Sequence, residues 1–149
     1  MVAGKILSSS VARVGVLARQ RFTDVHRVYI RQGGVTSLAV VKSLNAQAAD
    51  DEVQRFLLGN EADLLSELAP HPNILRLLGV MDDSQLITEY CGIGTLAEAC
   101  PRMSMLQKTI ALKQVASAMY HCHVGNDQRA GRQPCTPVVH RDIKASNVL

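Results

Sequence analysis

The spacing of apolar residues changes along this chain, and the order of those changes limits the fold more than any other feature. Residues 14–30 alternate roughly between apolar and polar side chains and are rich in β-branched ones, which predicts two strands with a bend at 18–24. A pair of glycines in 32–34 predicts a turn. Residues 38–41 form a short apolar run that predicts a buried strand, and this strand ends, unusually, on a lysine, Lys42.

A helical spacing replaces the alternation from residue 50 to residue 68. Acidic residues at 50–52 suit the first turn of a helix, where the helix dipole favours negative charge, and Pro70 and Pro72 end the pattern. Glu61 lies on the apolar stripe of this helix, because leucines occupy the neighbouring positions on its face. These leucines are Leu57, Leu64, Leu65 and Leu68. A carboxylate on an apolar face needs a partner, which another segment must supply.

Two further apolar runs, 74–80 and 86–90, predict strands that are joined by a hairpin loop at 81–85. Five short strands and one helix predict the α+β class, with a small five-stranded antiparallel sheet as the first lobe. We place this lobe at residues 14–91, behind a lead-in at 1–13.

The remainder of the chain, residues 92–149, has a different character. Gly92 and Gly94 predict a hinge, residues 103–123 have the spacing of one long helix, and residues 124–137 predict a loop. A second, mainly helical lobe is therefore expected to begin at residue 92.

Composition excludes several classes of protein. With 47% apolar residues and a net charge of +3 over 149 residues, the chain can bury a core and does not resemble a disordered protein. Polar residues interrupt every apolar run before the roughly 18 residues of a membrane span, so no span is expected. Aromatic residues are 3% with no tryptophan, which leaves few platforms for base stacking, and we expect no nucleic-acid partner. The sequence indicates no oligomeric state.

Four cysteines lack the paired spacing of a metal site, and we interpret them as reduced thiols of an intracellular, cytoplasmic protein. They are Cys91, Cys100, Cys122 and Cys135. Residues 121–123 combine two histidines and a cysteine, but adjacent residues of a helix point in different directions, which argues against a metal site. The first 22 residues are basic and lack acids, which is compatible with a transit peptide, although a lead-in followed by a strand is favoured.

The most specific motif lies in residues 138–149. It contains the pattern H-R-D-x-x-x-x-N, which begins at His140 and resembles the catalytic loop of eukaryotic protein kinases. The resemblance implies that Asp142 orients the attacking hydroxyl, that Lys144 neutralises the transferring phosphate, and that Asn147 supplies an amide oxygen to Mg²⁺. The lysine is typical of the serine/threonine enzymes, so ATP and a protein serine or threonine are the implied substrates.

Other parts of the sequence resemble kinase elements in the family's order. Lys42 resembles the third-strand lysine that binds the α- and β-phosphates, and Glu61 resembles its ion-pair partner. Residues 68–80 resemble the segment between that helix and the fourth strand. The pattern is most similar to the tyrosine-kinase-like group of serine/threonine kinases, which includes the receptor-like kinases.

The same resemblance implies a nucleotide pocket. Thr88 corresponds to the gatekeeper, and the backbone carbonyl of Glu89 and the amide and carbonyl of Cys91 are expected to face the adenine edge. Val25 aligns with the valine that follows the family's glycine-rich hairpin. Val40 replaces the usual alanine above the adenine and narrows the pocket slightly.

The hairpin itself departs from the family. Backbone amides of the glycine-rich hairpin normally approach the phosphates closely, but the three glycine positions hold Ala18, Gln20 and Thr23. Gln20 in particular places a side chain where a phosphate is expected to pass.

These observations support an enzyme, an ATP-dependent serine/threonine kinase represented by about the first half of its domain and inactive alone. They also leave open a pseudokinase-like binding or regulatory module, because the glycines and the magnesium-binding Asp-Phe-Gly are missing. A third possibility is an incomplete product whose long helix exposes an apolar face.

Overall fold

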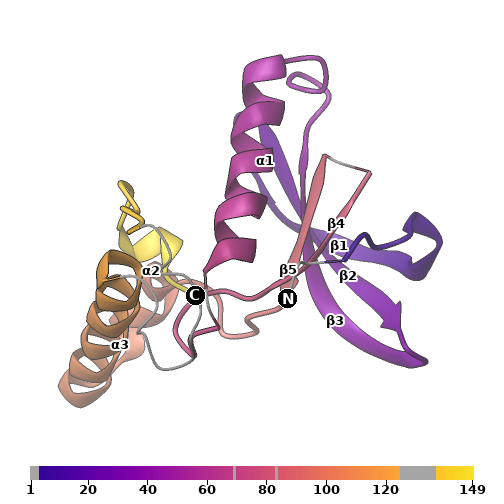
Figure 1. Cartoon of the computed structure of the whole chain (residues 1–149). Helices are drawn as coiled ribbons and strands as arrows, with labels where there is room; N and C mark the ends of the chain where they lie inside the picture. Colours follow the sequence, from indigo (N-terminus) through magenta and orange to yellow (C-terminus); the bar gives the residue numbers. More distant parts are fainter. Residues whose placement is uncertain (1–3, 69, 83, 125–136) are drawn as a thin grey trace. The chain divides into compact units, whose positions relative to one another are not determined.

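The computed structural model describes residues 4–68, 70–82, 84–124 and 137–149. Its central element is a five-stranded antiparallel sheet with the order β1-β2-β3-β5-β4 (Figure 1). The strands are β1 (Val11–Arg19), β2 (Thr23–Gln32), β3 (Val35–Leu44), β4 (Leu77–Met81) and β5 (Gln85–Glu89). The expected α+β class and the antiparallel sheet with one helix are confirmed.

Several boundaries differ from the expected ones. β1 begins at Val11 rather than 14, and β4 begins at Leu77 rather than 74. β3 is ten residues long, and the run at 38–41 is not uniformly buried. Ala39 and Val41 are fully buried, whereas Leu38 is 39% exposed, because successive side chains of a strand point to opposite faces and only one face is fully covered here.

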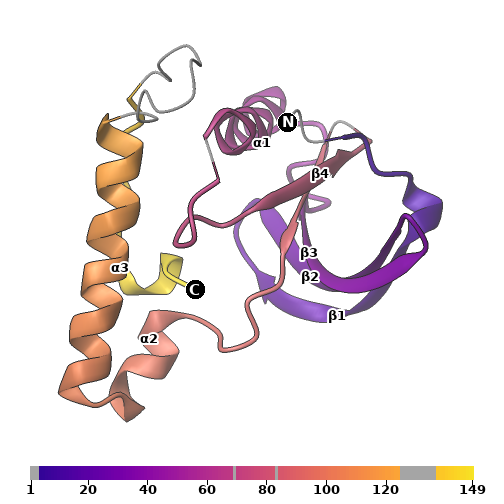
Figure 2. The same ribbon diagram turned by 60° about the horizontal axis from the view of Figure 1, so that its bottom comes forward.

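The sheet carries a hydrophobic cluster on each face. One cluster joins the buried side chains of β2 and β3, among them Val28 and Val41, to Ile87 of β5. The other lies under the helix α1 (Glu52–Glu67), where Leu58 and Ala62 pack against Leu86. Figure 2 shows β1, β2 and β3 curving together, with α1 seen nearly end-on.

The helix α1 is shorter than expected and buries a different stripe. Asp51 precedes it and accepts hydrogen bonds from the amides of Val53 and Gln54, so it caps the helix from outside. Two leucines of the apolar stripe expected around Glu61 do not face the sheet: Leu57 is 52% exposed and Leu64 is 43% exposed. The helix is rotated so that residues 58, 62 and 65 face the sheet, which puts Glu61 at the margin of the buried stripe.

Residues 4–6, which lie in the lead-in expected at 1–13, pack against the sheet. Ile6 is only 5% exposed and donates its amide hydrogen to the carbonyl of Val80 at 2.9 Å. Lys5 pairs with the same residue as a parallel β-bridge. Gly79 makes this approach possible, because a Cβ there would lie 2.5 Å from the carbonyl oxygen of Gly4.

The chain divides into two compact units, Met1–Glu67 with Leu75–Tyr90, and Leu68–Ile74 with Cys91–Leu149. The second unit contains α2 (Leu96–Ala99), a 3-10 turn η2 (Cys100–Arg102), α3 (Met105–Val124) and a 3-10 turn η3 (Ala145–Asn147). The long helix is close to the expected 103–123, while α2 was not expected. The loop expected at 124–137 lies largely outside the described residues. Within the described ranges, no helix combines the length and the hydropathy needed to cross a bilayer.

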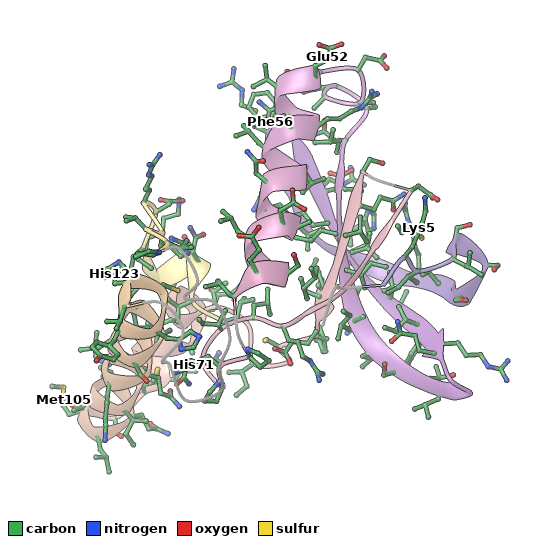
Figure 3. The ribbon with its side chains drawn as sticks, viewed as in Figure 1. Lys5, Glu52, Phe56, His71, Met105 and His123 are labelled. Carbon is green, nitrogen blue, oxygen red and sulfur yellow. The ribbon has the colours of Figure 1, made fainter. Side chains whose placement is uncertain are left out.

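Residues 68–74 belong to the second unit through His71, which is labelled beside α3 in Figure 3. His71 Nε2 lies 3.2 Å from Ser117 Oγ, and its ring is 4.8 Å from that of His121. The amide of Asn73 donates to His71 Nδ1 at 3.1 Å. Since Nδ1 is therefore the acceptor, the neutral ring carries its proton on Nε2 and donates it to Ser117.

Candidate functional site

The first group of candidate residues lies between β3 and α1. Lys42 Nζ lies 2.6 Å from Glu61 Oε2, with side chains that are 28% and 42% exposed. The strand places the lysine on the face that α1 covers, and the helix places the carboxylate at the edge of its buried stripe. The ion pair expected from the sequence is therefore present. At this exposure such a pair adds at most about 1 kcal/mol to stability, so its main effect is to orient the ammonium group.

A cavity of about 260 Å³ adjoins this ion pair. Its lining combines the two charged groups with the β1–β2 turn and one side of α1. The lining residues are Gln20, Arg21, Phe22, Thr23, Lys42, Gln54, Leu57, Leu58 and Glu61. A charged ammonium at the wall of a concave surface is suited to bind an anion.

The β1–β2 turn is held by side chains rather than by glycine geometry. The backbone amide of Gln20 donates a hydrogen bond to the carbonyl of Thr23, and the Thr23 hydroxyl donates to the side-chain oxygen Oε1 of Gln20, both at 2.8 Å. Asn45 Nδ2 donates to the carbonyls of Gln20 and Arg21 at 3.2 and 3.0 Å. Ala18 lies within β1, opposite Val25. The backbone amide of Gln20 is thus already hydrogen-bonded within the turn. The turn therefore has fewer free backbone donors for a phosphate than a glycine-rich loop has.

Asn45 was not identified from the sequence. The signal available was weak, since an asparagine directly after a strand marks a turn but does not show which turn its side chain reaches. Only the pairing of β2 with β3 brings Asn45 to the β1–β2 turn, through the hydrogen bond from its amide to the carbonyl of Phe22.

The sheet face that carries Lys42 also carries other candidate residues. Val25 is directly opposite Lys42, and Val40 is directly opposite Thr88, which is only 5% exposed.

The last two candidate residues follow Thr88 along the chain. The backbone amide of Glu89 donates to the carbonyl of Arg76 at 3.1 Å, and Oε1 of Glu89 accepts the Arg76 amide at 2.8 Å. Cys91 is partly buried and begins the second part of the second unit.

The second group of candidate residues surrounds Asp142. Lys144 Nζ donates to Asp142 Oδ2 at 2.9 Å, and Asn147 Nδ2 donates to both the carbonyl oxygen and Oδ2 of Asp142, each at 2.9 Å. The Asp142 amide donates to His140 Nδ1 at 3.3 Å. Arg141 has φ of 64°, the left-handed conformation that a sharp turn requires of this backbone.

The electrostatics of this turn keep Asp142 ionised. Hydrogen bonds from Lys144 and then Asn147 lower the pKa of the Asp142 carboxyl below its ordinary value, with further lowering by the charges of Lys144 and His140. The carboxyl is well exposed to solvent, so it is accessible as a hydrogen-bond acceptor. An ionised, oriented carboxylate can accept the hydrogen of a hydroxyl group.

The turn is tied into the second unit at both of its ends. The amide of Leu96 at the start of α2 donates to the carbonyl of Val148 at 2.7 Å, and the amide of Val138 donates to the carbonyl of Cys122 at 2.8 Å. A capping box at Thr95 and Glu98 fixes the first turn of α2, and Leu96 is the first residue of that turn.

The donor set for a metal ion is small. Among the described residues, no group of three histidine, cysteine or acidic side chains gathers at one place. In Asn147 the amide nitrogen makes both bonds to Asp142, so the amide oxygen is the atom that remains to act as a ligand. One amide oxygen beside one carboxylate fits Mg²⁺, which proteins hold through few side chains while phosphates and water complete its shell.

The structure thus brings Lys42 together with Glu61 in the first unit and Asp142 with Lys144 and Asn147 in the second. Comparison with known proteins points the same way. The pattern of the family described as "Protein tyrosine and serine/threonine kinase" matches residues 11–149.

Individual proteins are similar over most of the chain. Aurora kinase A-A of Xenopus laevis is 31% identical over 140 residues, which is 89% of this chain and 31% of that protein. The serine/threonine-protein kinase SIK3 homolog of Danio rerio is 31% identical over 115 residues, covering 73% of this chain and 9% of the relative. Serine/threonine-protein kinase 12 of Arabidopsis thaliana is 31% identical over 116 residues, covering 73% and 23%. The chain therefore spans less than a third of the length of each of these relatives.

Proposed function

The chain belongs to the protein kinase family, and on that basis we propose that it carries part of an ATP-dependent serine/threonine kinase. The reaction is transfer of the γ-phosphoryl group from Mg-ATP to the hydroxyl of a protein serine or threonine. The observation that carries the proposal is the hydrogen-bonded turn of Asp142, Lys144 and Asn147.

The roles follow from the chemistry of each group. Asp142 accepts the hydrogen bond of the attacking hydroxyl and orients it, and Lys144 neutralises charge on the transferring phosphate. Asn147 holds Mg²⁺ through its amide oxygen. Bound magnesium supplies charge neutralisation for the phosphates. The ammonium of Lys42, oriented by Glu61, binds the α- and β-phosphates.

The nucleotide base belongs, in this proposal, to the sheet face of Val25, Val40 and Thr88, followed by the backbone of Glu89 and Cys91. Ala18 lies next to this surface as the partner of Val25. The proposal also retains the tyrosine-kinase-like group and a cytoplasmic location as its finer parts, the latter supported by cysteine usage.

A second candidate, a pseudokinase-like binding module, is favoured by one observation. The β1–β2 turn has no glycine, and Gln20 and Thr23 bond to each other where phosphate-binding amides are usual in the family. Such a module would keep the lobe but bind no nucleotide.

Thermal unfolding with and without Mg-ATP separates the two candidates. We expect Mg-ATP to raise the melting temperature of the 149-residue chain, since a ligand that binds only the folded state stabilises it. Lys42→Met should abolish the rise, whereas Lys113→Met, which removes an exposed lysine of α3, should preserve it. No rise with the original chain supports the binding module, and a rise that survives Lys42→Met contradicts the role given to Lys42.

Phosphoryl transfer is a separate expectation. The sequence contains no Asp-Phe-Gly, whose aspartate supplies the second metal ligand in this family. We therefore expect no measurable transfer of radiolabelled phosphate by these residues alone. Transfer that disappears with Asp142→Asn would show that the 149 residues suffice.

A further inference from the structure

Arg27 lies on the sheet face assigned above to the nucleotide, although it was not among the residues expected there. It is directly opposite Val40 on β3, and Val40 is directly opposite Thr88 on β5. Directly paired residues of an antiparallel sheet point to the same side. The neighbouring residue Val28 points to the other side and is fully buried in the opposite cluster.

The guanidinium group of Arg27 lies over an aromatic ring. Its Cζ is 6.0 Å from the centre of the Tyr90 ring, just after the end of β5. This distance is at the outer limit of a cation–π contact. The arginine therefore presents a planar cation beside Tyr90, the last residue of the first unit.

This cation has no counter-ion among the described residues. The ion pairs of the described chain do not include Arg27, and its Nε–H is buried with no hydrogen-bond acceptor. Buried donors are normally satisfied, and a cation on a surface of valines normally has an anionic partner. An arginine in this state is suited to a ligand that supplies a hydrogen-bond acceptor together with an electron-rich surface, and the ring nitrogens and π-face of a purine offer both.

The spacing along the strands relates Arg27 to the ion pair. Arg27 is two residues beyond Val25, and Val25 is opposite Lys42. Two residues of a strand span about 7 Å, which separates the backbone positions of the two cations along the sheet. Leu58 and Ala62 of α1 cover the Lys42 end of this face, where they pack against Leu86. The Arg27 end of the face lies beyond that cluster.

We propose that Arg27 is a nucleotide-binding residue that stacks its guanidinium on the base, while Lys42 binds the phosphates. This inference rests on the proposed function, since it assumes that the sheet face of Val40 receives a nucleotide. Arg27 would extend the apolar surface of Val25 and Val40 with a planar cation, which suits the π-face of a purine.

Adenosine and ATP together test the inference, because adenosine has the base without the phosphates. Arg27→Met keeps an unbranched apolar stem. We expect it to lower the affinities for adenosine and for ATP by a similar factor of about three to ten. Arg31→Met is the matched control. It removes the same charge from an exposed position of β2 further along the strand, and it should leave both affinities unchanged.

Each outcome decides the matter. A loss shared by adenosine and ATP supports base stacking, whereas a loss confined to ATP shows that Arg27 acts on phosphate charge and overturns the inference. Equal binding before and after the substitution overturns it as well, while leaving the proposed function intact. Failure of the original chain to bind either ligand overturns both proposals.

Melting temperatures of the variants check the fold. Arg27→Met removes an unsatisfied buried donor, so the melting temperature should stay the same or rise. If that variant unfolds, Arg27→Leu provides the same removal of charge with a different side-chain shape, and the affinity comparison is made with it.

Discussion

At the scale of single residues, the turn at 142–147 shows how exposed groups can still hold one carboxylate in a defined state. Asp142 Oδ2 accepts hydrogen bonds from Lys144 and from Asn147, so two donors converge on a single oxygen. Because the carboxyl is exposed, solvent screens these interactions and their effect on stability is small. Their effect on the charge and orientation of Asp142 is the more important one.

Replacing Lys144 by methionine should raise the pKa of Asp142 toward its ordinary value, since Lys144 is the first cause of the lowering. A lowered pKa in the folded state stabilises the fold above the ordinary pKa of about 3.9, and this contribution is lost as the pH falls through the lowered value. Carboxyl carbon resonances followed by NMR during acid titration measure the shift. Lys113→Met serves as the control, and an Asp142 pKa that is the same in Lys144→Met and in the original chain would contradict the assignment.

Residue-level prediction succeeded where two groups lacked partners that only the other could supply. Glu61 on an apolar helix and Lys42 at the end of an apolar strand fit this description, and the structure pairs them. It did not succeed for the β1–β2 turn. There the contacts of Gln20, Thr23 and Asn45 depend on how two turns approach each other, which no local pattern specifies.

At the scale of elements, the packing of residues 4–6 on β4 depends on the absence of a single side chain. A Cβ at Gly79 would lie 2.7 Å from two carbons of Ile6 as well as 2.5 Å from the Gly4 carbonyl oxygen. These contacts involve both backbone and a buried side chain, so they cannot be relieved by rotating a flexible group.

Gly79→Val should therefore destabilise the first unit by about 1 to 3 kcal/mol, the usual range for overpacking. Gly59→Ala is the matched control, because a Cβ at Gly59 meets nothing within 4 Å and alanine favours the helix α1. Urea unfolding followed by circular dichroism measures both. A Gly79→Val chain as stable as the original would show that residues 4–6 can leave β4 without loss.

Elements were predicted from the sequence to within a few residues where the apolar period was clear, as for α3 and β5. The short helix α2 was missed although its signal was present. Thr95 and Glu98 form a capping box, but the helix that this box begins is only four residues long. The buried stripe of α1 was misjudged at Leu57 and Leu64. A helix of this composition offers two apolar stripes, and only the packing against Leu86 decides between them.

Exposed apolar side chains lie on the outside of α1. Phe56 is 66% exposed and lies on the side of the helix away from the sheet (Figure 3). Val53 is also exposed one turn earlier. This follows from the same rotation of the helix, which turned residues 58, 62 and 65 inward.

At the scale of the whole molecule, the chain crosses between its two units at three places. Residues 68–74 form the shortest stretch between two crossings. This segment is attached to α3 by His71, whose pKa is lowered by burial and by the neighbouring charge of His121. A histidine with a lowered pKa binds its proton less readily in the attached state than in the released state. The attachment is therefore strongest above the ordinary value of about 6.5 and weakens as the pH falls below it.

Acidification from about pH 7.5 to about pH 5.5 should accordingly lower the protection of the Asn73 amide against hydrogen exchange, since protonation of His71 Nδ1 removes its acceptor. His71→Gln should abolish this pH dependence. His123→Gln, which alters a different histidine of α3, should retain it. Protection of the Asn73 amide that stays constant through this range would contradict the attachment described above.

The pairing of residues 5 and 6 with Val80 also affects how the protein behaves at high concentration. An uncovered sheet edge offers its backbone groups to strands of other molecules, which is a common route to aggregation. On the β4 side, Lys5 and Ile6 already occupy part of that edge. On the opposite side, β1 has two irregularities in its pairing with β2 and carries Arg13 and Arg19, and both features discourage the addition of a further strand. Both margins of the sheet are thus poor templates for intermolecular β-structure.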